Sequence, residues 1–320
     1  MSSTLPWNPA DTPLMLAPMQ GLTNRALRSL FGEWGKPDVM FTEFIRVRPG
    51  SRKAFSPVDL LEATTISEEI PLVVQLIGKE TSGLEASARA AQDNGAVHLN
   101  LNLGCPYGRM NSGSAGGALL KHPEGLGHRL NVLRNCIEGS FSVKVRSGYD
   151  DPEQIFSLLP FFEDSGVDFV VLHPRTVIQK YGGRADHELT ARLVEKTRLP
   201  IIANGDVTNA TEGEMVLKET GAAGLMIGRG AIRDPLIFER LRGNAARKPS
   251  REERAIELKY YITELAVRYQ KIFQGESQAL NKLKTILSML GEDELFGKQV
   301  RKILRSNNLE RFLKLLEKLA

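Results

Sequence analysis

Short apolar runs alternate with stretches of helical periodicity over the first three quarters of the chain. Eight of these runs have the length of buried strands, and amphipathic segments of helical length separate most of them. This alternation predicts parallel strands that are joined by crossover helices. The expected strands are Leu14–Ala17, Val39–Thr42, Leu72–Ile77, Val97–Asn102, Ser142–Val145, Phe169–Leu172, Ile201–Ala203 and Gly224–Ile227.

The number of repeated units predicts how the sheet closes. Eight β/α units between residues 13 and 240 match the size of a (β/α)8 TIM barrel, an α/β fold. Glycines at positions 95, 166 and 221 follow expected helices and fit C-caps. A doubly wound open sheet is the alternative, but it calls for a Gly-x-Gly-x-x-Gly loop after the first strand. This chain has Ala17-Pro18-Met19-Gln20-Gly21 there, which favours the barrel.

The last quarter of the chain has a different pattern, with leucine and isoleucine at three- and four-residue spacing and no strand-like run. Residues 250–273, 278–290 and 295–319 are expected to be helical, with a break at Asn307-Asn308. The segment 243–250 contains Gly, Lys-Pro and Ser, a composition typical of domain boundaries. We therefore expect a barrel domain in residues 1–243 and a small helical bundle in residues 250–320.

Charge is distributed unevenly between these two parts. The chain of 320 residues has 42 Lys and Arg and 38 Asp and Glu, a net charge of +4. Residues 247–320 hold 16 of the basic and 10 of the acidic residues, a net charge of +6, and the remainder carries −2. The basic tail fits either a polyanionic partner such as nucleic acid or a solvated helical surface with excess lysine.

Several classes of protein are disfavoured by composition. No segment approaches the ~18 consecutive apolar residues of a membrane span, and the polar N-terminus lacks a signal-peptide pattern. Two cysteines cannot form a disulfide framework and suit a reducing cytosol. The five histidines are scattered, and no Cys/His cluster has metal-ligand spacing. We expect a cytoplasmic monomer with no metal site and no membrane partner.

Candidate chemistry gathers where the expected strands end. Cys105 follows the fourth strand and precedes a glycine-rich stretch, the position at which barrel enzymes place reactive groups. Because side chains alternate along a strand, His98, Asn100 and Asn102 share one face, which we expect to point into the barrel. Gln75 lies near the end of the third strand, where its carboxamide could meet the polar edge of a flavin ring.

The later strands bring positive charge and glycine to the same rim. Lys144 and Arg146 share one face of the fifth strand, and inward cations call for an anionic or electron-rich partner, such as a flavin or a core carboxylate. His173 and Arg175 repeat this spacing on the sixth strand. Glycine-containing loops follow the last two strands, at positions where such barrels often bind phosphate: Asn204-Gly205-Asp206 and Gly228-Arg229-Gly230.

Taken in order, these motifs resemble those of the tRNA-dihydrouridine synthase family. That family has a flavin-bearing barrel and a C-terminal helical domain. It uses reduced nicotinamide to reduce FMN and then reduces a uridine in tRNA. The motifs that carry the resemblance are Ala17-Pro18-Met19-x-Gly21-x-Thr23, Thr42-Glu43, Val74-Gln75-Leu76-x-Gly78, Asn102-x-Gly104-Cys105-Pro106, Lys144-x-Arg146-x-Gly148, His173-x-Arg175-Thr176, Asn204-Gly205-Asp206 and Gly228-Arg229.

The resemblance implies a role for each matching residue. Cys105 would be the acid that protonates the uracil, with NADPH or NADH as the reductant. The residues implied in FMN binding are Ala17, Pro18, Met19, Gln75, Lys144, His173, Asn204, Gly205, Asp206, Gly228 and Arg229. The residues implied in contacts with the uracil or the tRNA are Arg46, Asn102, Arg146, Tyr181, Lys282 and Lys284.

Within the family, Thr42-Glu43-Phe44-Ile45-Arg46-Val47 is most similar to the subfamily that acts at uridine 16. The chain departs from the family pattern at Asn100 and Asn24, where aspartate is common. Residues 107–117 are expected to act as a lid, because their glycines permit hinge motion. Two other readings remain: a flavin enzyme acting on a free pyrimidine, and a tRNA-binding protein with a vestigial flavin site.

Overall fold

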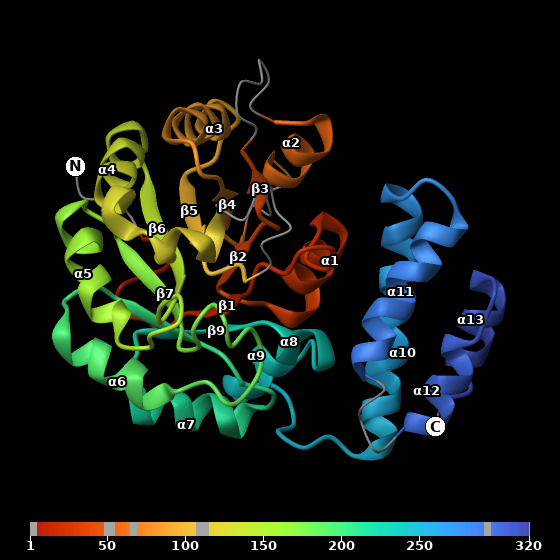
Figure 1. The fold of residues 1–320 in the computed structure, drawn as a ribbon. Coiled ribbons are helices and arrows are strands. Elements are labelled where there is room, and N and C mark those ends of the chain that lie inside the picture. Colours follow the sequence, from red (N-terminus) through yellow and green to blue (C-terminus); the bar gives the residue numbers. More distant parts are fainter. Residues whose placement is uncertain (1–4, 48–54, 65–68, 107–114, 291–295, 320) are drawn as a thin grey trace.

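A closed barrel of parallel strands forms the larger part of the molecule, and helices surround it (Figure 1). The computed structural model describes residues 5–47, 55–64, 69–106, 115–290 and 296–319. The strands run in the order β2-β1-β9-β8-β7-β6-β5-β4-β3, and pairing of β2 with β4 closes the ring. Their bounds are β1 Leu14–Leu16, β2 Val39–Phe41, β3 Ile45–Arg46, β4 Leu72–Ile77, β5 His98–Leu103, β6 Ser140–Arg146, β7 Phe169–His173, β8 Ile201–Asn204 and β9 Gly224–Ile227.

The prediction of a TIM barrel is confirmed, and all eight expected strands form within one or two residues of their expected ends. The short strand β3 was not expected. It extends the chain after β2 and pairs with the end of β4, where Ile45 lies opposite Leu76. Its two residues are too few to produce a recognisable alternating pattern, so the sequence gives no signal for it.

Helices follow most of the strands and cover the outside of the barrel. In this part the helices are α1 Arg25–Leu30, α2 Pro57–Thr64, α3 Thr81–Asp93, α4 Leu126–Cys136, α5 Gln154–Asp164, α6 His187–Lys196, α7 Ala210–Thr220, α8 Arg229–Arg233 and α9 Ile237–Leu241. A π-helical turn, Phe31–Gly35, continues α1, and the 3-10 turns Gly116–Lys121 and Pro123–Gly125 precede α4. Gly95, Gly166 and Gly221 have positive φ at helix ends, as expected of C-caps.

The alternation of side chains in β5 is as expected. Leu99 and Leu101 belong to the apolar layer between strands and outer helices. Asn100 and Asn102 are also buried, but they hydrogen-bond to side chains of the neighbouring strand β4 inside the barrel. The deeper interior is apolar and contains Met15, Phe41, Val73, Phe169, Val171, Ile202 and Met226. A polar layer therefore lies on a hydrophobic floor, as a site at the barrel mouth requires.

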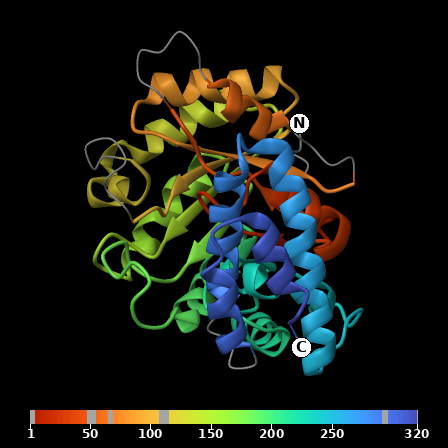
Figure 2. The same cartoon turned by 90° about the vertical axis from the view of Figure 1, so that its right-hand side faces the viewer.

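Four further helices lie along one side of the barrel (Figures 1 and 2). They are α10 Arg251–Ile272, α11 Glu276–Leu290, α12 Gly297–Leu304 and α13 Leu309–Leu316, and we call them the C-terminal helices. The expected break at Asn307-Asn308 is present, because the Asn308 side chain caps α13. Ser250 and Glu253 form a capping box that begins α10. None of the described helices is long and apolar enough to cross a membrane.

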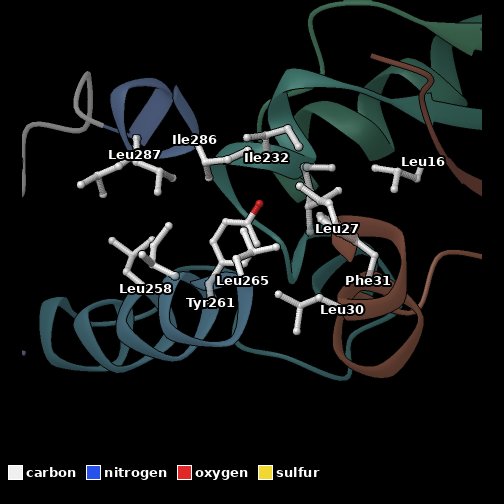
Figure 3. Packing of buried hydrophobic residues seen from close by; sticks show 14 of the residues in the cluster. Leu16, Leu27, Leu30, Phe31, Ile232, Leu258, Tyr261, Leu265, Ile286 and Leu287 are labelled. Carbon is white, nitrogen blue, oxygen red and sulfur yellow. The ribbon is translucent and has the colours of Figure 1, made fainter. Parts of the chain in front are cut away.

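One continuous apolar cluster joins the C-terminal helices to the barrel (Figure 3). Tyr261 of α10 packs edge-on against Phe31, with ring centroids 6.4 Å apart. Leu27 of α1 faces the same cluster, and Ile286 of α11 lies beside Ile232 of α8 (Figure 3). Close packing of this kind resists relative motion. The C-terminal helices are therefore held firmly beside the loops that follow β1 and β9.

Candidate functional site

A pocket opens at the C-terminal ends of β1, β6, β7, β8 and β9. This is the rim at which the carboxyl ends of parallel strands converge. The pocket is lined by Ala17, Pro18, Met19, Lys144, His173, Arg175, Tyr181, Asn204, Gly205, Asp206, Val207, Thr208, Met226, Ile227, Gly228, Arg229, Gly230 and Arg233. Ten of the eleven residues expected to contact a cofactor are in this lining, and Gln75 is outside it.

Lys144 projects from β6 into this pocket. Its Nζ donates a hydrogen bond of 2.8 Å to Asn204 Oδ1, and Asn204 in turn donates to the Met226 carbonyl oxygen at 2.8 Å. Burial and then the nearby charge of Arg146 lower the pKa of Lys144 to about 7, although Cys105 acts in the opposite direction. An anion in the pocket would therefore stabilise the charged form of the Lys144 amine.

Arg175 organises the next part of the rim. Its side chain is almost fully buried and donates hydrogen bonds to the carbonyl oxygens of Gly182 and Gly183 and to Asp206 Oδ2, the last at 2.7 Å. It also donates to His173 Nε2 at 3.1 Å. A guanidinium group has no acceptor, so this ring nitrogen accepts the hydrogen bond and carries no proton. The Arg175 contacts therefore fix the His173 tautomer.

The charges around His173 keep it neutral. Burial, followed by the charges of Lys144, Arg146, Arg175 and Arg229, lowers its pKa well below the ordinary value. Four cationic side chains thus act on one point of the rim. This excess of positive charge makes the pocket suitable for a phosphate or another anion.

Asp206 is the carboxylate among the residues that line the pocket. Partial burial opposes its ionisation, but hydrogen bonds from Arg175 and from the Ala185 N–H, with the charges of Arg175 and Arg229, lower its pKa. Its backbone has a left-handed φ of 50°. The carboxylate therefore acts on the loop and on Arg175, and any phosphate contact at this position would come from the backbone.

Tyr181 stands at the pocket edge between two guanidinium groups. Its ring centroid is 5.5 Å from Arg146 and 4.9 Å from Arg229, and 46% of the residue is exposed. Arg146 is almost fully buried and donates to the carbonyl oxygens of Gly104, Thr176 and Lys180. The electron-rich partners of Arg146 in the structure are thus main-chain oxygens and an aromatic face.

A chain of amide hydrogen bonds connects β4, β5 and β6 inside the barrel. Gln75 Nε2 donates to Asn100 Oδ1, and Asn102 Nδ2 donates to Gln75 Oε1, both at 2.8 Å. Asn100 Nδ2 also donates to Ser142 Oγ at 2.8 Å. Gln75 is completely buried. These contacts hold the Gln75 carboxamide inside the barrel, and the cofactor contact expected of Gln75 stays a prediction.

The same chain of hydrogen bonds positions Cys105. Asn102 Oδ1 accepts from the backbone N–H groups of Gly104 and Cys105, each at 3.0 Å, and so closes a tight turn after β5. The Cys105 carbonyl oxygen accepts from the Gly117 N–H at 3.1 Å. Cys105 as a whole residue is partly exposed. The other cysteine, Cys136, is buried in the helical layer, as expected of a packing residue.

The other residues named in the sequence analysis lie in different parts of the molecule. Arg46 is exposed on β3, and Lys284 is half-buried on α11. Lys282 donates to the Gly21 carbonyl oxygen at 2.7 Å and therefore contacts the barrel. Asn24 caps α1 by accepting from two backbone N–H groups, a task that aspartate performs equally well. The proposed lid lies mainly in residues 107–114, outside the described residues.

Several residues that line the pocket were given no role from the sequence, among them Arg233, Val207 and Thr208. Arg233 follows Arg229 by one helical turn on α8, a spacing that could have revealed it. Val207 and Thr208 follow the Asn204-Gly205-Asp206 motif directly and carry no distinctive chemistry. Within the described parts of the chain, no group of three or more His, Cys, Asp or Glu residues is arranged to hold a metal ion.

Comparisons with known proteins agree with this geometry. The family described as dihydrouridine synthase (Dus) matches residues 15–315. A tRNA-dihydrouridine(16) synthase of Haemophilus influenzae is 34% identical over 254 residues, covering 77% of this chain and 82% of that protein. A probable tRNA-dihydrouridine synthase of Rhodobacter capsulatus is 30% identical over 223 residues, covering 69% and 68%.

A solved structure shares the fold at much lower sequence identity. Morphinone reductase in complex with tetrahydroNAD has a TM-score of 0.53 and 11% identity, over 76% of this chain and 90% of that one. This likeness concerns the barrel architecture alone.

Proposed function

Because the chain belongs to the dihydrouridine synthase family, we propose that it reduces a uridine of tRNA to 5,6-dihydrouridine. FMN is the resident cofactor in this proposal, and NADPH or NADH is the reductant. One structural observation supports it most strongly: a pocket rich in positive charge and glycine lies beside the strand end that carries Cys105. A cofactor site and an acid on neighbouring strands are what the reaction needs.

The residues of the pocket fit FMN in chemical type. Arg229 and the backbone of Gly228 and Gly205 suit the phosphate, because N–H groups and a guanidinium group are strong donors to phosphate oxygens. Lys144 suits the polar edge of the ring system, where negative charge develops on reduction. Met19 offers an apolar surface. When bound, FMN would supply the hydride that the protein itself cannot provide.

The side chains around Cys105 then account for the second half of the reaction. Reduction of the C5=C6 bond of uracil needs a hydride at C6 and a proton at C5. The proton is assigned to the Cys105 thiol. It would pass from Sγ to C5 of the uracil and so remove the enolate character at C5 and O4. Asn102 holds the backbone at Cys105 through two hydrogen bonds and so fixes the position from which the proton leaves.

The position of the uridine is part of the proposal. Relatives named as tRNA-dihydrouridine(16) synthases, at 30–34% identity, support uridine 16. The segment from Thr42 to Val47 supports the same subfamily, and Arg46 is exposed on it. Residues 250–320 are proposed to hold the tRNA and residues 1–243 to bind FMN. The protein is further proposed to act as a monomer in the cytoplasm, which size-exclusion chromatography and cell fractionation would test.

The central experiment compares two substrates under identical conditions. The purified protein, loaded with FMN and supplied with NADPH or NADH, is expected to form dihydrouridine in a tRNA transcript and much less in free uridine. Sequencing of tRNA from cells that lack the protein should show loss of dihydrouridine at position 16. Equal turnover of free uridine would favour the alternative of a pyrimidine reductase, and a protein unable to bind FMN would contradict the proposal.

A further inference from the structure

Gly21 is held from two sides by charged residues of distant segments. It lies in the loop between β1 and α1, which supplies Ala17, Pro18 and Met19 to the pocket. Its backbone N–H donates to Glu43 Oε2 at 2.7 Å, and its carbonyl oxygen accepts from Lys282 Nζ at 2.7 Å. Glu43 follows β2, and Lys282 belongs to α11 of the C-terminal helices.

The rest of this loop is closed by its own hydrogen bonds. The Met19 N–H donates to Thr23 Oγ1 at 2.8 Å, and the N–H groups of Leu22 and Thr23 donate to the Met19 carbonyl oxygen at 3.0 Å. Arg28 then donates to the Thr23 carbonyl oxygen. Met19 is thus tied to the base of a small turn whose tip is Gly21. A shift of Gly21 would be passed to Met19, which lines the pocket.

Lys282 is fixed at its other end by the packing of α11. The neighbouring Leu283 and the residues one turn on, Ile286 and Leu287, are completely buried in the cluster that joins the C-terminal helices to the barrel (Figure 3). The Lys282 ammonium group also lies 6.0 Å from the centre of the Phe273 ring. The place of Lys282 on the molecule is therefore set by the packing of α11.

The fit around Gly21 is close. Gly21 has a φ of +78°, and a Cβ atom at this position would lie 3.3 Å from Lys282 Nζ. Glu43 is largely buried on the opposite side, and burial raises the pKa of its carboxyl group despite the Gly21 N–H, Lys282 and Arg28. The two peptide groups that flank Gly21 therefore bridge an acidic and a basic side chain, and the absence of a Cβ atom at Gly21 lets Lys282 come close.

The geometry points to Lys282 as a positioning residue that couples the C-terminal helices to the pocket loop formed by residues 17–23. Its ammonium group is used to hold this loop and is not a contact for the tRNA backbone. The inference rests on the proposed function only where FMN is concerned. It assigns the helices a second task beyond holding RNA, which is to keep Met19 and its neighbours in the conformation that receives the cofactor.

The test uses Lys282→Met, which keeps the aliphatic stem and removes the donor. Lys282→Arg keeps a donor, and Lys271→Met, at an exposed position of α10, is the matched control. Hydrogen exchange of the ligand-free full chain is measured first. Faster exchange in residues 17–24 is expected for Lys282→Met, with unchanged exchange for Lys271→Met and partial recovery for Lys282→Arg. Unchanged exchange in Lys282→Met would overturn the coupling, whatever the protein reduces.

FMN binding and tRNA binding are measured next on the same variants. The dissociation constant of FMN is expected to rise about tenfold in Lys282→Met, the scale of one charge-assisted hydrogen bond. The dependence of tRNA affinity on salt should stay as in the parent chain. If the slope of log affinity against log salt falls by the amount expected for the loss of about one phosphate contact, Lys282 binds RNA instead. If hydrogen exchange in the variants changes as expected but the parent chain binds no FMN, the proposed function is contradicted and the coupling between Lys282 and the loop still holds.

Discussion

The barrel mouth and the C-terminal helices both contain many cations, but they use them differently. At the mouth, Lys144, Arg175 and Arg229 converge on one pocket and together lower the pKa of His173, although Arg175 is itself paired with Asp206. In the helices, several cations have internal partners. Arg254 pairs with Glu257 and Asp234, and Arg268 pairs with Glu33 and Glu264.

The difference shows that net charge alone does not locate a binding surface. Residues 247–320 carry +6, yet Arg254, Arg268 and Lys282 serve contacts within the protein. The exposed cations that remain include a group along α12 with the three- and four-residue spacing of one helical face: Lys298, Arg301, Lys302 and Arg305. The arrangement of the basic side chains therefore distinguishes cations with partners inside the protein from exposed cations that can contact a polyanion.

The largest effect is expected at the barrel mouth, from Cys105→Ala. Loss of the proton donor should slow uridine reduction by about 100-fold or more, the usual contribution of a general acid. FMN affinity should stay unchanged, because Cys105 is outside the pocket lining. Single-turnover reduction of tRNA by the pre-reduced enzyme measures the effect directly.

Cys136→Ala is the matched control for this variant, since Cys136 is buried against the outer helices. It should reduce tRNA at the parent rate. A Cys105→Ala enzyme with an unchanged single-turnover rate would assign the proton to another group.

The second effect concerns the polar layer beneath the mouth. Asn100→Leu removes a side chain that accepts from Gln75 and donates to Ser142. Leaving these buried groups without partners should lower the free energy of unfolding by about 2 kcal/mol. Urea denaturation of the ligand-free protein measures this loss. An exposed substitution such as Lys218→Gln on α7 should change stability by less than about 0.5 kcal/mol. Equal stability of the two variants would show that the amide chain contributes nothing.

The third effect depends on pH and tests whether Lys144 meets an anion. Its pKa is about 7 in the ligand-free pocket, and a bound anion would raise that value. Above pH 7 the amine must then take up a proton on binding. FMN affinity should therefore fall as pH rises from 7 to 9, by up to about tenfold per pH unit.

Fluorescence titration of FMN at several pH values measures this dependence. Lys144→Met should bind FMN more weakly at pH 7 and lose most of the decline above it. A parent protein whose affinity is constant between pH 7 and 9 would place the anion away from Lys144.

Much of the mouth could be predicted from the sequence because strand alternation is a local property. The inward direction of Asn100 and Asn102, and the strand-end positions of Lys144 and Asn204, follow from a period of two residues. The partners of these side chains could not be predicted in the same way. Gln75 pairs with amides 25 and 27 residues away, and Lys282 reaches Gly21 across 261 residues. Such contacts depend on register and packing, which no local pattern encodes.

The smallest effect returns to the C-terminal helices and decides whether their exposed cations differ from the structural ones. Arg301→Gln and Lys302→Gln together should weaken tRNA binding with little change in stability. If each contacts a phosphate, the slope of log affinity against log salt falls by about 0.9 per residue. Lys218→Gln on α7 serves as the control for the loss of one surface charge, and each single variant of α12 is compared with it. A double variant with the parent slope would show that α12 does not meet the RNA, and the basic tail would then be a solvated surface.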